Sequence, residues 1–184
     1  MMSRVQKFFL TLVCSEDFLA MEPYEIKEWL KLDSIGINTE VEVFYIAVRW
    51  LMHDWEQRRE HLVSFMRLVR FGLLEPWRIV EFRLKSNARL LTEILNDEEV
   101  QKILESSLSY SAYRSSNDES SERFADFLSR FGFERLYSRD LMIDNIWQRM
   151  FKHTQYTYDH FQEFLNIIRS NANVNWKNNV IVQK

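Results

Sequence analysis

Two groups of histidine and aspartate are the residues of this chain best suited by type to bind a metal. They are His53, Asp54 and His61 in the first half, and His153, Asp159 and His160 in the second. The first two histidines lie eight residues apart across a predicted helix break, and no further cluster supplies the remaining ligands of a zinc site. In the second group the aspartate can favour the dipole of a helix start while the histidines stay solvated. We therefore predict no metal site.

Catalytic motifs are the next source of chemistry, and the sequence contains none that we recognise. It has no Gly-x-Ser-x-Gly elbow, Gly-rich phosphate loop, Cys-x-x-Cys pair or His-Glu-x-x-His helix. The carboxylate pairs Glu40 with Glu42 and Glu98 with Glu99 could serve acid–base chemistry, but both pairs fall in first turns of predicted helices. Capping and helix-dipole effects explain them there. We predict no catalytic residue, no cofactor and no enzymatic activity.

Aromatic and basic residues could instead bind bases or other ligands. Most of the tryptophans occupy apolar helical stripes, where burial is the usual outcome, and Trp55 and Trp176 are the predicted exposed exceptions. The basic pair Arg58-Arg59 is interleaved with Glu56 and Glu60, and the net charge is -3. A one-sided basic patch is missing, so nucleic acid is not an expected partner.

The composition indicates a helical protein with a real core. Of 184 residues 46% are hydrophobic, and there are only 3 Gly and 2 Pro, too few for frequent hairpin turns. The lone Cys14 cannot form an intrachain disulfide and lies in an apolar helical pattern, which favours the cytoplasm or the nucleus. No apolar stretch approaches the roughly 20 residues that span a bilayer, so no membrane partner is expected.

The start of the chain superficially resembles a signal peptide, because Arg4 and Lys7 precede an apolar run that ends at Cys14. Two acidic residues, Glu16 and Asp17, follow at once, and no small-x-small cleavage site is present. An amphipathic helix explains the apolar positions better.

Helical periodicity predicts the elements that would position these residues in the first half. Ser15 caps a short turn, and Pro23 begins a helix that buries Ile26, Trp29 and Leu30. Thr39 and Glu42 have capping-box spacing at the start of the next helix. In that helix Phe44, Ala47, Val48, Trp50 and Leu51 form the buried stripe, whereas Glu42, Arg49 and His53 fall on the wetter side.

Further helices follow through the second half. Apolar stripes predict them around 62–69, 76–84, 90–95, 100–104, 124–131, 143–151 and 158–168. The serine-rich stretch 106–122 is predicted to be a linker or loop, and its serines 115–121 are candidates for phosphorylation. The Asn-rich tail allows either disorder or a short strand at Val180-Ile181-Val182.

A run of short signatures resembles BACK domains, which follow the BTB domain in BTB-BACK and BTB-Kelch proteins. The resemblance covers about Val5 to Leu74, and it lies in the order and joint spacing of the signatures. They are Ser15-Glu16-Asp17-Phe18-Leu19, Thr39-Glu40-Val41-Glu42-Val43-Phe44, Ala47-Val48-Arg49-Trp50-Leu51-Met52-His53-Asp54, Arg58, His61-Leu62 and Val69-Arg70-Phe71-Gly72-Leu73-Leu74. The sequence departs from the family at Gly72, where many relatives have Pro. We also expect neither a BTB domain before Met1, nor the opening helix pair, nor Kelch repeats.

The resemblance implies an all-α fold of stacked helical hairpins, followed here by a second small helical segment. We expect a BACK-like domain at 1–84, helices and the serine-rich linker at 85–121, a C-terminal helical region at 122–170 and a tail at 171–184. The expected function is that of a protein-interaction or scaffold module. The alternatives are a substrate adaptor of a cullin-RING ubiquitin ligase, as the resemblance implies, and a helical ligand- or nucleic-acid-binding domain.

The first helix supplies the candidate interface residues. If the opening helix pair is missing, Phe8, Phe9 and Leu12 would face a partner in its place. The resemblance implies protein partners, with a BTB-containing chain, a cullin or a second copy of this chain as the options.

Overall fold

The protein is described by a computed structural model, which places residues 8–84, 89–151 and 155–175. Every regular element among these residues is a helix, so the all-α prediction is confirmed. The chain divides into two compact units, residues 1–46 with 140–184 and residues 47–139. The division falls inside α5 (Glu40–His53).

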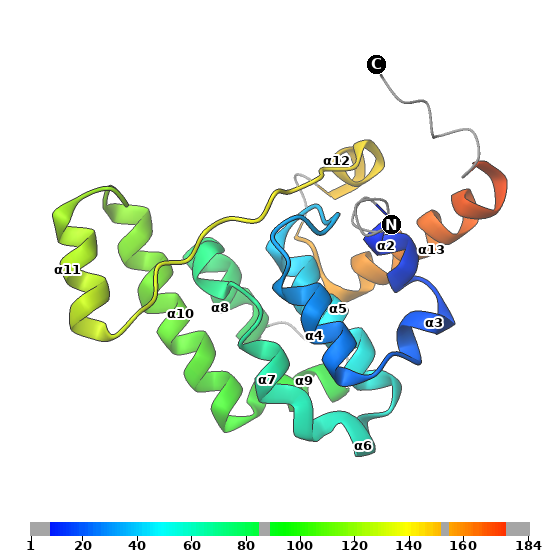
Figure 1. The fold of residues 1–184 in the computed structure, drawn as a ribbon, viewed down its shortest axis with the longest axis horizontal. Helices are drawn as coiled ribbons and strands as arrows, with labels where there is room; N and C mark the ends of the chain where they lie inside the picture. Colours follow the sequence, from blue (N-terminus) through cyan, green and yellow to red (C-terminus); the bar gives the residue numbers. More distant parts are fainter. Residues whose placement is uncertain (1–7, 85–88, 152–154, 176–184) are drawn as a thin grey trace. The chain divides into compact units, whose positions relative to one another are not determined.

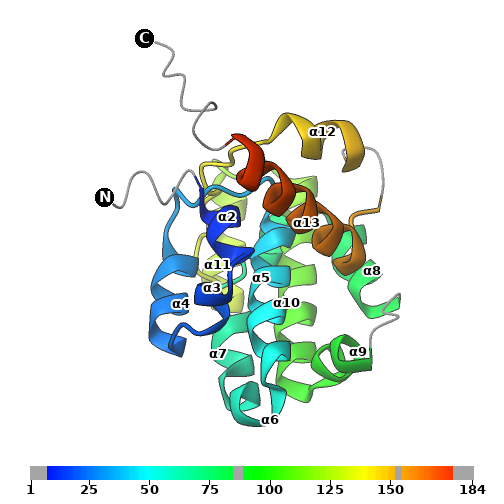
Figure 2. The ribbon, with the colours of Figure 1, turned by 90° about the vertical axis from the view of Figure 1, so that its right-hand side faces the viewer.

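The first unit joins the beginning of the chain to its end. It contains the first turns of α5 and the whole of five further helices: α2 (Phe9–Val13), α3 (Glu16–Leu19), α4 (Pro23–Lys31), α12 (Asn145–Phe151) and α13 (Tyr158–Asn175). Helix α13 packs against α2, as Figure 2 shows. It adds Phe161, Phe164 and Leu165 to the core residues of the N-terminal helices. The core of this unit therefore depends on segments more than 100 residues apart in sequence.

Local signals at the start of this unit work as the sequence predicts. The Ser15 hydroxyl accepts a hydrogen bond from the Phe18 N–H at 3.2 Å, and α4 begins at Pro23. Ile26 and Leu30 of α4 are fully buried. The Cys14 thiol is buried and donates to the Leu10 carbonyl at 3.0 Å, so it packs as a small apolar side chain.

The second unit is arranged around α10 (Glu98–Ser116). Helix α10 packs against α7 (Leu62–Met66), η2 (Phe71–Leu73), α8 (Pro76–Leu84) and α9 (Arg89–Asn96), and Figure 1 shows it running beside them. The unit also contains α6 (Trp55–Arg58), η1 (Arg59–His61) and α11 (Glu122–Phe131). The ring of Trp50, which is buried as predicted, stacks on Phe65 with a centroid distance of 5.1 Å. Gly72 lies under the ring of Tyr110, where a Cβ would come within 2.8 Å of it.

The linker predicted at 106–122 is wrong for its first eleven residues, because α10 continues to Ser116. The periodicity missed Tyr110 and Ser111, which are buried and dock the helix on the rest of the unit. The Ser111 hydroxyl donates to the Leu74 carbonyl. The hydroxyls of exposed serines such as Ser115 and Ser116 donate hydrogen bonds to backbone carbonyls four residues earlier in the same helix. Serine can therefore satisfy its hydroxyl without interrupting the helix.

The aromatic side chains of α11 pack against one another and against two tyrosines of α10. Phe127 stacks on Tyr113 with a centroid distance of 3.9 Å, and Phe124 meets Tyr110 edge to face at 5.8 Å. Phe124 and Phe127 are buried in this cluster, while Phe131 is 62% exposed. The aromatic richness of this region is therefore largely explained by its own core.

Candidate interaction surface

The start of α5 carries a buried carboxylate that the sequence analysis placed on the wetter side of the helix. Glu42 is completely buried, so that prediction is wrong. Its carboxylate accepts from the Asn38 backbone N–H at 2.7 Å and from the Asn38 side-chain amide at 2.9 Å. The capping-box spacing with Thr39 correctly marks the helix start, but the strongest reach-back bond goes to Asn38.

A tyrosine from the second half of the chain completes the environment of Glu42. The Tyr156 hydroxyl donates to Glu42 Oε1 at 3.1 Å, and the Tyr45 hydroxyl donates to the Tyr156 carbonyl at 3.0 Å. Burial raises the pKa of Glu42 to about 7, and the hydrogen bonds from Asn38 and Tyr156 lower it only in part. Burial, followed by the nearby Glu42 charge, raises the pKa of Tyr156 above its ordinary value. No basic side chain is bonded to this carboxylate in the part of the chain that the structure describes.

The segment 140–144 is fixed to the loop before α5 by three backbone donors. The Asp140 N–H donates to the Asp33 carbonyl at 2.9 Å, and the Met142 N–H donates to the Ile37 carbonyl at 2.8 Å. The Asp144 N–H donates to the Asn38 side-chain oxygen at 2.6 Å. Since every second N–H of the segment donates to the loop 33–38, the segment is extended. Asn38 thereby links the buried carboxylate of Glu42 to this segment.

Asp144 also starts the next helix. Its carboxylate accepts from the Ile146 N–H at 2.7 Å and from the Trp147 N–H at 3.2 Å, as an N-cap does. The Trp147 ring meets Tyr156 edge to face at 5.4 Å. Helix α12 is thus seated on the same tyrosine that binds Glu42.

Fixing this segment leaves apolar side chains exposed. Leu141, Met142, Ile143 and Met150 are exposed, with Ile143 the most open at 54%. We call these four residues the 141–150 surface. Leu141, Met142 and Ile143 lie on backbone that the contacts to Asp33, Ile37 and Asn38 hold in place, and Met150 lies on α12 of the same unit. A group of exposed apolar residues on a fixed backbone is typical of a protein contact site.

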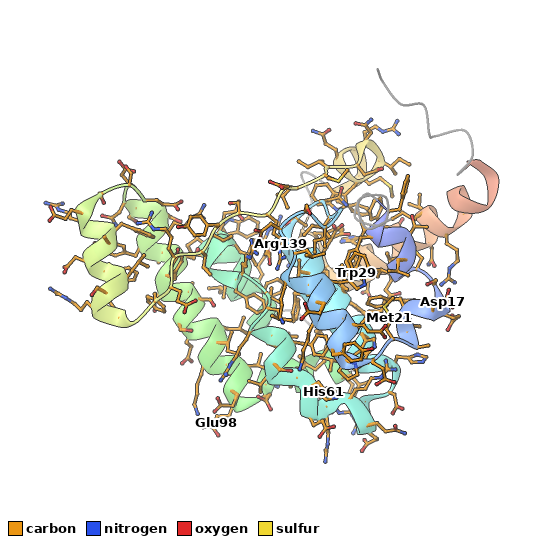
Figure 3. The ribbon with its side chains drawn as sticks, viewed as in Figure 1. Asp17, Met21, Trp29, His61, Glu98 and Arg139 are labelled. Atoms are coloured by element: carbon orange, nitrogen blue, oxygen red, sulfur yellow. The ribbon has the colours of Figure 1, made fainter. Side chains whose placement is uncertain are left out.

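The three residues predicted to face a partner from the first helix lie in different environments. Phe8 is 48% exposed, Leu12 is half-buried, and Phe9 is fully buried. Phe9 packs on Trp29 with a centroid distance of 5.6 Å, and Figure 3 shows Trp29 beside α2. Phe9 therefore belongs to the core, and partner contact by Phe8 and Leu12 stays a prediction.

The remaining residues that the sequence analysis considered as ligand-binding or metal-binding candidates lie outside this surface. Trp55 is half-buried, and its indole N–H donates to Glu93 at 3.0 Å. Within residues 8–84, 89–151 and 155–175, no three His, Cys, Asp or Glu side chains gather as metal ligands would. No helix in these ranges is long and apolar enough to cross a membrane. His153 and Trp176 lie outside the described residues, as does the short strand considered at 180–182.

Sequence reasoning missed the 141–150 surface. The run Asp140-Leu141-Met142-Ile143-Asp144 has no helical period, and only Ile143 was assigned to a stripe. An apolar triplet between two aspartates was the available signal. Its role became visible only when Asp33, Ile37 and Asn38, about 100 residues earlier, were seen to bind it.

Comparison with known proteins agrees with the signatures in the first half. The family model BACK, "BTB And C-terminal Kelch", matches residues 1–84, which confirms the resemblance. Kelch-like protein 3 of Danio rerio is 32% identical over 69 residues, which are 38% of this chain and 12% of that protein. Gigaxonin of Mus musculus is 31% identical over 62 residues, covering 34% of this chain and 10% of gigaxonin.

A third relative extends the match slightly further. Kelch-like protein 31 of Danio rerio is 30% identical over 95 residues, covering 52% of this chain and 14% of that protein. In each case the match spans only a small part of the relative's length. No solved structure matches this chain significantly.

Proposed function

We propose that this chain, in which residues 1–84 match the BACK family, is a protein-interaction or scaffold module without catalytic activity. Its contact site is the 141–150 surface, which belongs to the same compact unit as the first half of the BACK match. The observation that carries the proposal is the exposure of Leu141, Met142 and Ile143 on backbone that is already fixed from its other side.

The energetic argument for this surface is its rigidity. A segment that is already held by hydrogen bonds loses little conformational entropy when a partner binds it. The apolar side chains then contribute roughly 25 cal/mol for each Å² removed from water. Exposed apolar groups on an unfixed loop would lose part of that gain to ordering.

Quantitative affinity purification tests the proposal. We expect Leu141→Asp with Met150→Asp to lose the proteins that co-purify with the tagged wild-type chain, because both changes place a charge on the 141–150 surface. Tyr24→Asp is the matched control, since Tyr24 is 66% exposed on α4 of the same unit and outside this surface. Equal recovery of the same proteins with all three chains would refute the assignment. Circular dichroism of each variant establishes that its helices are retained.

A finer proposal is a substrate adaptor of a cullin-RING ubiquitin ligase, and it rests on the BACK resemblance alone. Co-purification of a cullin that survives in Tyr24→Asp would support it. If no cullin co-purifies with the wild-type chain, the adaptor role is contradicted while the interaction proposal still stands.

A further inference from the structure

The extended segment 140–144 has one backbone edge that its own unit leaves open. The N–H groups of Asp140, Met142 and Asp144 all donate to residues 33–38. In extended backbone the N–H and C=O groups of successive residues point to opposite sides. Leu141 and Ile143 therefore face away from residues 33–38, and their N–H groups bond to no acceptor among the described residues. Figure 1 shows this segment as the yellow trace that leads into α12.

The side chains along this edge define what could bind there. Leu141 and Ile143 are exposed by 46% and 54%, and they share one face of the extended segment. Asp140 and Asp144 lie at its two ends on the other face, about 13 Å apart at 3.3 Å per residue. Both carboxylates are on exposed residues, although Asp144 also caps α12.

We infer that the edge formed by Leu141 and Ile143 binds an extended peptide by strand addition, and that the peptide carries apolar residues between two basic ones. This rests on the proposed function and specifies how that surface recognises its partner. The open N–H and C=O groups require a strand as the occupant, since a helix has already used its own backbone groups. In an antiparallel pair, directly opposed residues share a face, so apolar residues would sit opposite Leu141 and Ile143. Lysine or arginine would then lie opposite Asp140 and Asp144.

The probe is the capped peptide acetyl-Lys-Val-Thr-Val-Lys-amide, in which the two lysines have the same spacing as Asp140 and Asp144. It is titrated into the full chain labelled with ¹⁵N. We expect the amide signals of Leu141 and Ile143 to move most, because their N–H groups gain acceptors. The same peptide N-methylated on both valine amides cannot pair in this register and should leave those signals in place.

Two variants separate backbone pairing from side-chain contact. Ile143→Pro removes an N–H that the fold does not use and replaces an exposed side chain by the proline ring. Met142 before it is already extended, so the unit should keep its structure. We expect this variant to bind the peptide at least about tenfold more weakly, as the loss of one hydrogen-bonded pair implies. Ile143→Val keeps the N–H and a branched apolar side chain, and should bind within about twofold of wild type.

Charge reversal tests the basic ends of the peptide. Asp140→Lys should weaken binding of the lysine-ended peptide and should favour acetyl-Lys-Val-Thr-Val-Glu-amide over it, because in the antiparallel register the glutamate of that peptide lies opposite residue 140 and its lysine lies opposite Asp144. Undiminished binding to Ile143→Pro, or to the N-methylated peptide, would overturn the inference. So would slow hydrogen exchange of the Leu141 and Ile143 amides in the free chain, since the edge would then already be occupied.

The outcomes also distinguish this inference from the proposed function. If the peptide does not bind while Leu141→Asp with Met150→Asp still loses its co-purifying proteins, the surface binds partners by another mode and strand addition is wrong. If the peptide binds as expected and purification is unaffected, the edge recognises strands but the assigned surface does not carry the chain's interactions.

Discussion

Replacing Glu42 by glutamine should remove a pH dependence from the stability of this protein. Burial raises the pKa of Glu42 from 4.5 to about 7 in the folded chain, whereas the unfolded chain keeps the ordinary value. Between these two values the folded state binds more protons than the unfolded state, so its stability falls as pH rises. The contribution is fully present below about 4.5 and is lost once the pH has passed about 7. The difference of 2.5 pKa units corresponds to about 3 kcal/mol.

Urea unfolding followed by circular dichroism between pH 5 and pH 8 measures this loss. We expect the free energy of unfolding of the wild-type chain to fall by about 2–3 kcal/mol more than that of Glu42→Gln over this range. All other groups are common to both chains, so their contributions cancel in the difference. Glu163→Gln, an exposed change on α13 in the same unit, should keep the wild-type pH dependence.

The pKa of Glu42 can also be measured directly, independently of the free energy of unfolding. The carboxyl carbon of Glu42, followed by NMR in the wild-type chain, should titrate near neutral pH. Tyr156→Phe removes the hydroxyl that donates to Glu42, so the pKa should rise further and the pH window should extend upward. Parallel stability curves for wild type and Glu42→Gln, together with a carboxyl that titrates near 4.5, would refute the reasoning.

Three further predictions concern packing, and each is measured by urea unfolding or circular dichroism. Phe9→Ala should cost about 3–5 kcal/mol because Phe9 is fully buried against Trp29, whereas Phe8→Ala should change stability by less than about 1 kcal/mol; equal losses would contradict the burial. Gly72→Ala should cost about 1–3 kcal/mol, since the added Cβ would meet Tyr110 at 2.8 Å and Leu136 at 2.9 Å; an unchanged stability would show that these two side chains move aside. A chain ending at residue 84 should lack the cooperative unfolding of the full chain, because Phe161, Phe164 and Leu165 of its first unit's core are absent; a sharp transition would show that the BACK match folds alone.

Local signals in the sequence determined most helices and their starts. Ser15, Pro23 and Thr39 act within one turn of themselves, so a hydroxyl or a fixed φ angle marks a helix start whatever lies nearby. The apolar stripes were equally local, and they correctly predicted that Ile26, Leu30 and Trp50 are buried. The BACK signatures were readable for the same reason, because they consist largely of such caps and stripes.

Long-range packing decided what local patterns could not. Glu42 has the residue type and the capping position of a solvated carboxylate, but Tyr156 and Asn38 bury it. Polar Ser111 can be buried in α10 because the Leu74 carbonyl, 37 residues earlier, accepts a hydrogen bond from its hydroxyl. The hydrophobic periodicity of each helix does not predict that α13 packs on α2, since that contact depends on which distant apolar faces meet.

The 141–150 surface shows the same division. The sequence by itself determined that Leu141, Met142 and Ile143 are apolar and lie between two aspartates. Only the tertiary structure decided that they remain exposed, because Asp33, Ile37 and Asn38 bind the other edge of their backbone. Burial is a property of the partners that a segment finds, and here those partners are separated from it by about 100 residues.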